Sequence, residues 1–60
     1  MSLEQLLGTI REEMENAEME AMKFTTGNKS AGTRARKSMQ IIKETAQNVR
    51  KHIQEIKNNS

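Results

Sequence analysis

Thr25-Thr26-Gly27-Asn28 is the stretch of this 60-residue chain that decides its fold, because it separates two long segments with the same apolar repeat. Glycine adopts the left-handed backbone conformation that ends many helices without a steric penalty, so Gly27 favours a helix stop. Asn28 or Ser30 then offers a side-chain oxygen that caps the start of a second helix. The stretch therefore predicts a tight turn between two helices, at about residues 26–30.

Both flanking segments place apolar or small residues at alternating intervals of three and four. This spacing is typical of a coiled-coil helix, which packs one stripe of residues against a partner. Ser2 followed by Gln5 adds the pattern of a capping box at the first helix. We predict helices at about residues 2–25 and 31–57. Their heptad stripes are Leu3, Leu7, Ile10, Met14, Ala17, Ala21 and Phe24, and then Gly32, Ala35, Met39, Ile42, Ala46, Val49, Ile53 and Ile56.

An antiparallel fold-back about Asn28 pairs the two heptad stripes so that the numbers of facing residues add to 56. Large residues then repeatedly face small ones, as interdigitating layers require. Phe24 opposite Gly32 is the sharpest case, since a ring lies on a helix only where a side chain is missing. The sequence predicts an all-α, antiparallel two-helix coiled-coil hairpin, a single domain over residues 1–60 with the heptad stripes as its core.

A hairpin of this size is marginal by itself. A domain of about 60 residues buries only about 60% of the surface that its unfolded chain exposes, and the chain has no cysteine for a disulfide. Oligomerisation is the remaining support for so small a protein. We expect a homodimer in the form of a four-helix bundle. Its expected contact edge is weakly polar and consists of Leu6, Ser38, Ile41, Thr45 and His52.

The composition argues against several functions. The chain has no Cys and no Asp, and its single histidine, His52, cannot make a metal site by itself. Gly27 and Gly32 do not form a nucleotide-binding glycine motif. No run approaches the roughly 18 apolar residues of a membrane span, and the start lacks the features of a secretory signal. We expect a cytoplasmic protein that is not an enzyme, with no cofactor, no metal, no small-molecule substrate and no membrane partner.

Charge is distributed unevenly along the chain. Residues 1–22 carry six Glu against one Arg, whereas residues 23–60 carry nine Lys or Arg against two Glu. Such asymmetry hints at nucleic-acid contact or at two segments that attract each other. Five cations lie within fifteen residues at the predicted turn, and we call residues 23–37 the basic elbow. Its cations are Lys23, Lys29, Arg34, Arg36 and Lys37.

The basic elbow has the residue types that bind phosphate. Lys and Arg supply charge, and the free amides of a helix N-terminus support it. No Glu lies between Glu20 and Glu44, so these cations are expected to have few partners within the hairpin. The chain lacks a base-reading motif and stacking aromatic residues. We therefore predict sequence-independent nucleic-acid binding through the five elbow cations, with a solvated loop as the plain alternative.

A second row of cations recurs every seven residues along the second helix, at Arg36, Lys43, Arg50 and Lys57. The simplest interpretation is that glutamates of the first helix pair with this basic stripe, for instance Glu18 with Arg36 or Lys43, as flanking charges do in coiled coils. Because Arg36 belongs to both groups, the stronger candidates for phosphate contact are Lys29, Arg34 and Lys37.

The order Gly-Asn-Lys, two small residues and an Arg-x-Arg step in residues 27–37, followed by Ile41-Ile42-Lys43, resembles the N-terminal domain of the chlamydial-type histone-like proteins. These are linker-histone-like bacterial chromatin proteins. The resemblance is specific over about residues 23–52, and elsewhere it is a shared helical, Glu-rich character. Such proteins typically continue into a long Lys- and Ala-rich tail that these 60 residues do not include, which implies weak binding per chain or binding as a dimer.

The resemblance implies sequence-independent binding and compaction of double-stranded DNA, in a nucleoid or in a genome packaged in a virion. By matching position it points to four phosphate contacts: Lys29, Arg34, Arg36 and Lys37. The main alternative is a coiled-coil module for protein–protein interaction with no nucleic-acid role. Attachment of the basic second helix to a membrane surface is less favoured, because its apolar side serves the hairpin and lacks Trp or Phe anchors.

Overall fold

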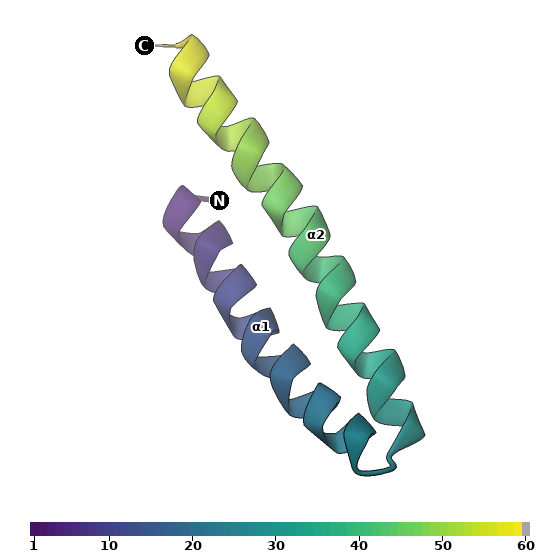
Figure 1. Ribbon diagram of the computed structural model, residues 1–60. Helices are drawn as coiled ribbons and strands as arrows, with labels where there is room; N and C mark the ends of the chain where they lie inside the picture. Colours follow the sequence, from purple (N-terminus) through teal and green to yellow (C-terminus); the bar gives the residue numbers. More distant parts are fainter. Residues whose placement is uncertain (60) are drawn as a thin grey trace.

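The computed structural model of the chain describes residues 1–59, which form two helices joined by a short turn. Helix α1 is Leu3–Thr25 and helix α2 is Lys29–Asn58. The helices run antiparallel and pack against each other as a hairpin (Figure 1). The rod measures 51 × 14 × 13 Å. The predicted all-α hairpin is confirmed.

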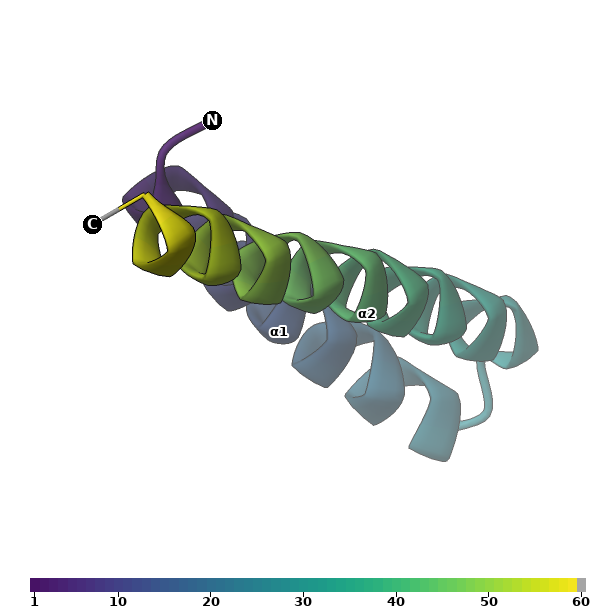
Figure 2. The ribbon, with the colours of Figure 1, turned by 90° about the horizontal axis from the view of Figure 1, so that it is seen from above.

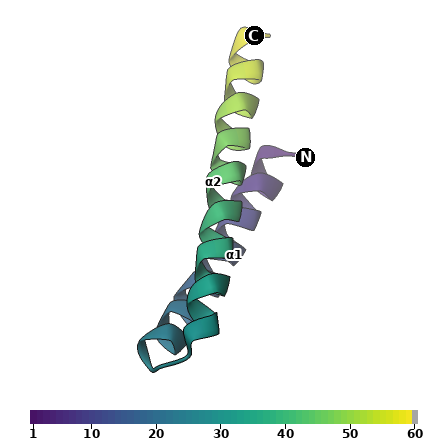
Figure 3. The ribbon, with the colours of Figure 1, turned by 90° about the vertical axis from the view of Figure 1, so that its right-hand side faces the viewer.

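Helix α2 is longer than α1 and extends beyond it at the end away from the turn. Figure 3 shows the last turns of α2 continuing past the N-terminus of α1, and it shows the two helices crossing at a shallow inclination. Helix α2 begins at Lys29, inside the range predicted for the turn, so the basic elbow lies almost entirely on helical backbone. Its charged side chains are therefore held on two fixed helix ends.

The start of α1 is closed by the predicted capping box. The backbone amide of Gln5 donates to the Ser2 hydroxyl over 3.1 Å, and the Ser2 amide donates to the Gln5 side-chain oxygen over 2.9 Å. Each contact satisfies an amide that has no partner inside the helix. The expected cap is confirmed, and it fixes where the first turn of α1 begins.

The turn uses one glycine and one asparagine. Gly27 has a φ of +108°, a conformation that side-chain-bearing residues rarely adopt. Asn28 is the cap of α2, since its side-chain oxygen accepts from the Ala31 amide over 3.3 Å. The Ser30 hydroxyl donates to the same oxygen over 2.9 Å. Of the two predicted caps, Asn28 closes the helix and Ser30 holds the capping side chain in place.

Exchanging single glycines for alanine is expected to change stability in opposite directions at two positions. Gly27→Ala forces a Cβ into a positive-φ conformation and should cost about 1 kcal/mol. Gly8→Ala lies inside α1 with open space around the added Cβ, so helix propensity should stabilise it by about 1 kcal/mol. Urea unfolding followed by circular dichroism measures both. If both variants changed the free energy of unfolding equally and in the same direction, the assignment of Gly27 to the turn would be contradicted.

The contact between the helices lies one row away from the predicted heptad stripes. Among the described residues, the buried ones are Leu6, Ala17, Ala31, Ser38 and Thr45. Three of these recur every seven residues on α2, which makes a row of small side chains that faces α1. The helices pack through this row because small side chains let two helix axes come close.

This packing corrects two predictions. The contact edge expected for a dimer is wrong, because Leu6, Ser38 and Thr45 are buried inside the hairpin. The heptad stripes form the core only in part: Ala17 is buried and several members are half-buried, such as Ile10 and Ile42. Large members remain about half exposed on the outside, and these are Leu7, Met14, Phe24, Met39, Ile53 and Ile56.

The predicted contact between Phe24 and Gly32 is confirmed. A Cβ added to Gly32 would lie 2.8 Å from ring atom Cδ1 of Phe24, so the ring rests where α2 has no side chain. The fold-back about Asn28 is thus correct at the turn end. The outer face of the ring stays open, since Phe24 is 53% exposed.

Candidate nucleic-acid interface

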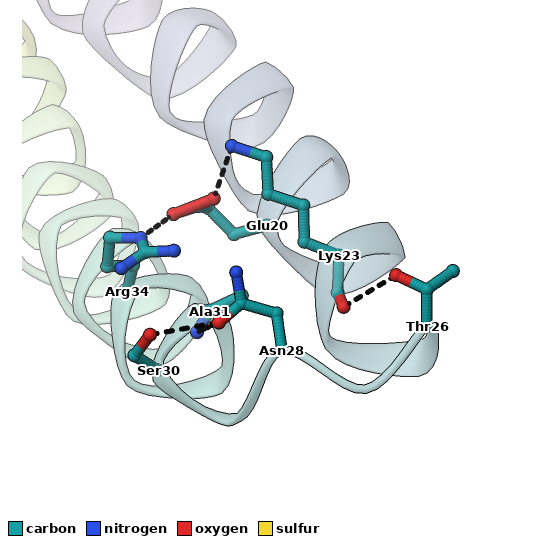
Figure 4. A network of polar contacts seen from close by, with 7 residues as sticks. All are labelled: Glu20, Lys23, Thr26, Asn28, Ser30, Ala31 and Arg34. Carbon is teal, nitrogen blue, oxygen red and sulfur yellow. Dashed lines mark hydrogen bonds and ion pairs between the residues drawn. The ribbon is translucent and has the colours of Figure 1, made fainter.

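The centre of the basic elbow is a cluster of three charged side chains around Glu20. The Arg34 guanidinium of α2 donates from Nε to Oε2 of Glu20 on α1, and the Lys23 ammonium lies 3.3 Å from Oε1 as an ion pair. Figure 4 shows the carboxylate between the two cations, above the turn. The cluster ties the end of α1 to the start of α2.

Glu20 is the one anion that holds two of the predicted site residues. Its side chain is 13% exposed. The hydrogen bond from Arg34 is the main reason why the pKa of Glu20 is below its ordinary value, and Lys23 lowers this pKa further while partial burial opposes both. A lowered pKa means that the pair's stabilisation is present above the ordinary glutamate pKa and is lost as the pH falls through the lowered value. The cluster is therefore intact at neutral pH.

The five predicted cations lie on two sides of the hairpin tip. One side has a shallow hollow that includes Lys29 and Arg36 together with Phe24 and Gly32. The other side has a hollow lined by the Glu20 cluster and by further residues that include Lys37, Ser38 and Ile41. The elbow therefore presents cations around the tip, and not on one flat surface.

Three of the five cations have no ion pair within the described part of the chain: Lys29, Arg36 and Lys37. All three are exposed on the first turns of α2. At the same helix end, Asn28 caps the amide of Ala31, and the preceding amides of Lys29 and Ser30 have no helical acceptor. Free cations and free amides thus occur together at the positive end of the α2 dipole.

The expected pairing of Glu18 with Arg36 or Lys43 is absent from residues 1–59. Arg34 and Arg36 therefore exchange places relative to the expectation from the sequence. Arg34, expected to be free, is paired, whereas Arg36, expected to be shared with a glutamate, is unpaired. The basic stripe along α2 therefore keeps its charge available at Arg36.

Residues 1–59 hold no cluster of three or more His, Cys, Asp or Glu side chains placed to bind a metal ion. In the same part of the chain, neither helix is long and apolar enough to cross a membrane.

Comparison with known protein families identifies the chain. Residues 4–59 match the family described as histone H1-like protein Hc1, which covers nearly all of the sequence. The chain belongs to the Hc1 family. The resemblance found in the basic elbow is thereby confirmed and extends through α1. No curated protein and no solved structure matches the chain.

Hc1 proteins are histone H1-like, DNA-binding and nucleoid-associated proteins, and the family is architectural and not enzymatic. In this Hc1 member, inspection of the sequence did not identify Glu20, which holds two cations of the basic elbow. A signal for it was present. The numbers of Glu20 and Arg34 add to 54, close to the value that the fold-back requires, and Lys23 follows Glu20 by one helical turn.

Proposed function

We propose that this Hc1 member binds double-stranded DNA without reading its sequence, through phosphate contacts at the basic elbow. The observation that carries the proposal is the group of three unpaired, exposed cations at the N-terminal end of α2, which are Lys29, Arg36 and Lys37. Phosphate oxygens are the partners that such cations and free helix amides favour. Membership of a DNA-binding family supports the same assignment.

Lys23 and Arg34 have a second role in this proposal. Both already hold the carboxylate of Glu20, which occupies the place that a phosphate oxygen would take. A DNA phosphate that approaches the tip competes with this carboxylate for the two cations. Three contacts are therefore free from the start, and two more require that Glu20 be displaced.

We propose that DNA binding is tighter when two hairpin tips belong to one particle. A single tip offers few phosphate contacts, so its affinity for one duplex is modest. Two linked tips convert the second contact into an intramolecular event with a high effective concentration. A homodimer would in this way bridge or compact DNA in a nucleoid or a packaged genome.

The test is a fluorescence anisotropy titration of a labelled, random-sequence duplex at several salt concentrations. The logarithm of affinity should fall linearly with the logarithm of salt, with a slope of about −0.9 for each phosphate contact. Three to five contacts per bound chain correspond to slopes from about −2.7 to about −4.5. A second duplex of unrelated sequence should give the same curve.

The same titration addresses the alternative function. A coiled-coil module for protein–protein interaction would leave the anisotropy unchanged even at low salt. Binding that differs strongly between the two duplexes would contradict recognition of the phosphate backbone alone.

A further inference from the structure

Phe24 is the only Phe, Tyr or Trp residue of the chain. Its heptad position predicts a place in the core, so the sequence indicates no aromatic residue for stacking. In the structure, however, Phe24 is 53% exposed, and only its inner side rests on Gly32. Figure 2 shows α1, α2 and the turn with no further element over either face of the hairpin. Within residues 1–59, the outer side of the ring is therefore open to a ligand.

The open ring belongs to a shallow hollow of about 420 Å³, which we call the Phe24 hollow. Its volume lies in the range of about 300–1,000 Å³ in which proteins bind small ligands. Two cations line the hollow, Lys29 and Arg36, and neither has an ion pair within the described part of the chain. No carboxylate lines it, whereas the hollow on the opposite side of the tip includes Glu13 and Glu20.

This lining selects a ligand by its chemistry. An open aromatic ring favours a second flat ring that stacks on it, and two unpaired cations favour negative charge. A ligand that satisfies both carries a ring and an anionic group side by side. A nucleotide has this combination, because its base is flat and aromatic and its phosphates are charged.

The spacing of the two cations suits a strand of nucleotides. Lys29 and Arg36 are seven residues apart on α2, which is about 10 Å along the helix axis. Gly32, opposite the ring of Phe24, lies between them in the sequence. Thr33 also lines the hollow, and its hydroxyl makes no hydrogen bond within residues 1–59. A strand that lies along this part of α2 can therefore place a phosphate at each cation and a base between them, over the ring.

We propose that the Phe24 hollow binds an unpaired nucleotide of a DNA strand, with its base stacked on Phe24 and the adjoining phosphates on Lys29 and Arg36. Proteins that bind single strands without reading their sequence combine cations with aromatic rings in this way. The inference rests on the proposed function, because two of the same cations hold the phosphates. It adds single-stranded or opened DNA to the ligands of the elbow, since the bases of an intact duplex are already stacked and paired.

Phe24→Leu tests the stacking contact, because it keeps an apolar side chain over Gly32 and removes the ring. Fluorescence anisotropy compares a short, labelled random-sequence strand with the duplex of the same sequence. The variant should bind the strand about 5- to 100-fold more weakly, the loss expected for one stacked base. Its salt slope should equal that of the parent chain, since no phosphate contact is lost, and its affinity for the duplex should not change.

Met22→Leu is the matched control. Met22 is 71% exposed near the same end of α1, but it does not line the Phe24 hollow. The control should bind the strand and the duplex as the parent chain does, and circular dichroism should show the same helicity for both variants. An unchanged affinity of Phe24→Leu for the strand, or equal losses for strand and duplex, would overturn the proposal.

A second measurement uses the parent chain and needs no substitution. Because the chain has one phenylalanine, the ring resonances of ¹³C-labelled Phe24 report on this site alone. They should move upfield when the unlabelled strand is added, as a stacked base shields them, and move far less with the duplex. If the duplex binds but the strand leaves these resonances in place, the stacking site is wrong and the phosphate contacts stand. If neither ligand binds at low salt, the proposed function fails as well.

Discussion

Replacing Lys29 and Arg36 together by Glu is expected to abolish retardation of random-sequence duplex DNA at low salt. Both residues are unpaired and lie on the same side of the tip. Each substitution removes one phosphate contact and adds a repulsive charge, so the affinity should fall by on the order of 100-fold. At salt concentrations where binding is still measurable, the slope should be shallower by about 1.8. Helicity should not change, since neither side chain holds the hairpin together.

The matched control for this variant is Arg11→Glu with Lys51→Glu. It makes the same change in net charge with two exposed residues outside the basic elbow. At 0.1 M salt we expect this control to bind within a few-fold of the parent chain, because exposed charges more than about 10 Å away are then largely screened. Equal losses in the two double variants would mean that net charge and not the elbow determines binding.

Replacing Glu20 by Gln is expected to tighten DNA binding by roughly tenfold at low salt. In the parent chain Glu20 holds both Lys23 and Arg34. Removal of the anion frees two cations for phosphate, so the salt slope should become steeper by up to about 1.8. Comparing the salt slopes of the variant and the parent chain separates new phosphate contacts from a general gain in positive charge. Fluorescence anisotropy titrations at several salt concentrations measure both the affinity and its salt slope.

Glu13→Gln is the control for the Glu20 variant. Glu13 lines the same hollow and loses the same charge, but it makes no ion pair within the described residues. Its affinity should rise by less than threefold, with an unchanged slope. If both variants steepen the slope equally, the carboxylate of Glu20 does not compete with DNA phosphate.

The turn and the direction of the fold could be predicted from the sequence because they depend on local chemistry. Gly27 needs a conformation that other residues avoid, and Asn28 supplies a capping oxygen. The fit of Phe24 on Gly32 depends on a missing side chain, which a sequence displays directly. Each of these features has its cause within a few residues of the turn.

The row that faces inward could not be predicted in the same way. A seven-residue repeat identifies a stripe of apolar residues, but neighbouring rows on a helix differ by a small rotation. Ser38 and Thr45 carry hydroxyls, so an apolar pattern does not count them as core, although their small size lets the helices approach. The stripe of larger residues then remains about half exposed on the outside of the hairpin.

The clustering of cations at the elbow is visible in the sequence, but their pairing is not. Five cations in fifteen residues are visible in the sequence. Whether each is free depends on side-chain reach across the hairpin. Glu20 and Arg34 are fourteen positions apart in the sequence and meet because the chain folds back between them. Such a contact follows from the register of the hairpin, and composition alone does not contain it.

DNA binding through the basic elbow is best tested by a map of amide chemical-shift changes when a short random duplex is added to the ¹⁵N-labelled chain. DNA binding at the basic elbow predicts that the largest changes occur at residues 23–37, with Lys29, Arg36 and Lys37 among the first to respond at low DNA ratios. Changes concentrated on the C-terminal half of α2, or none at low salt, would rule out binding through the elbow.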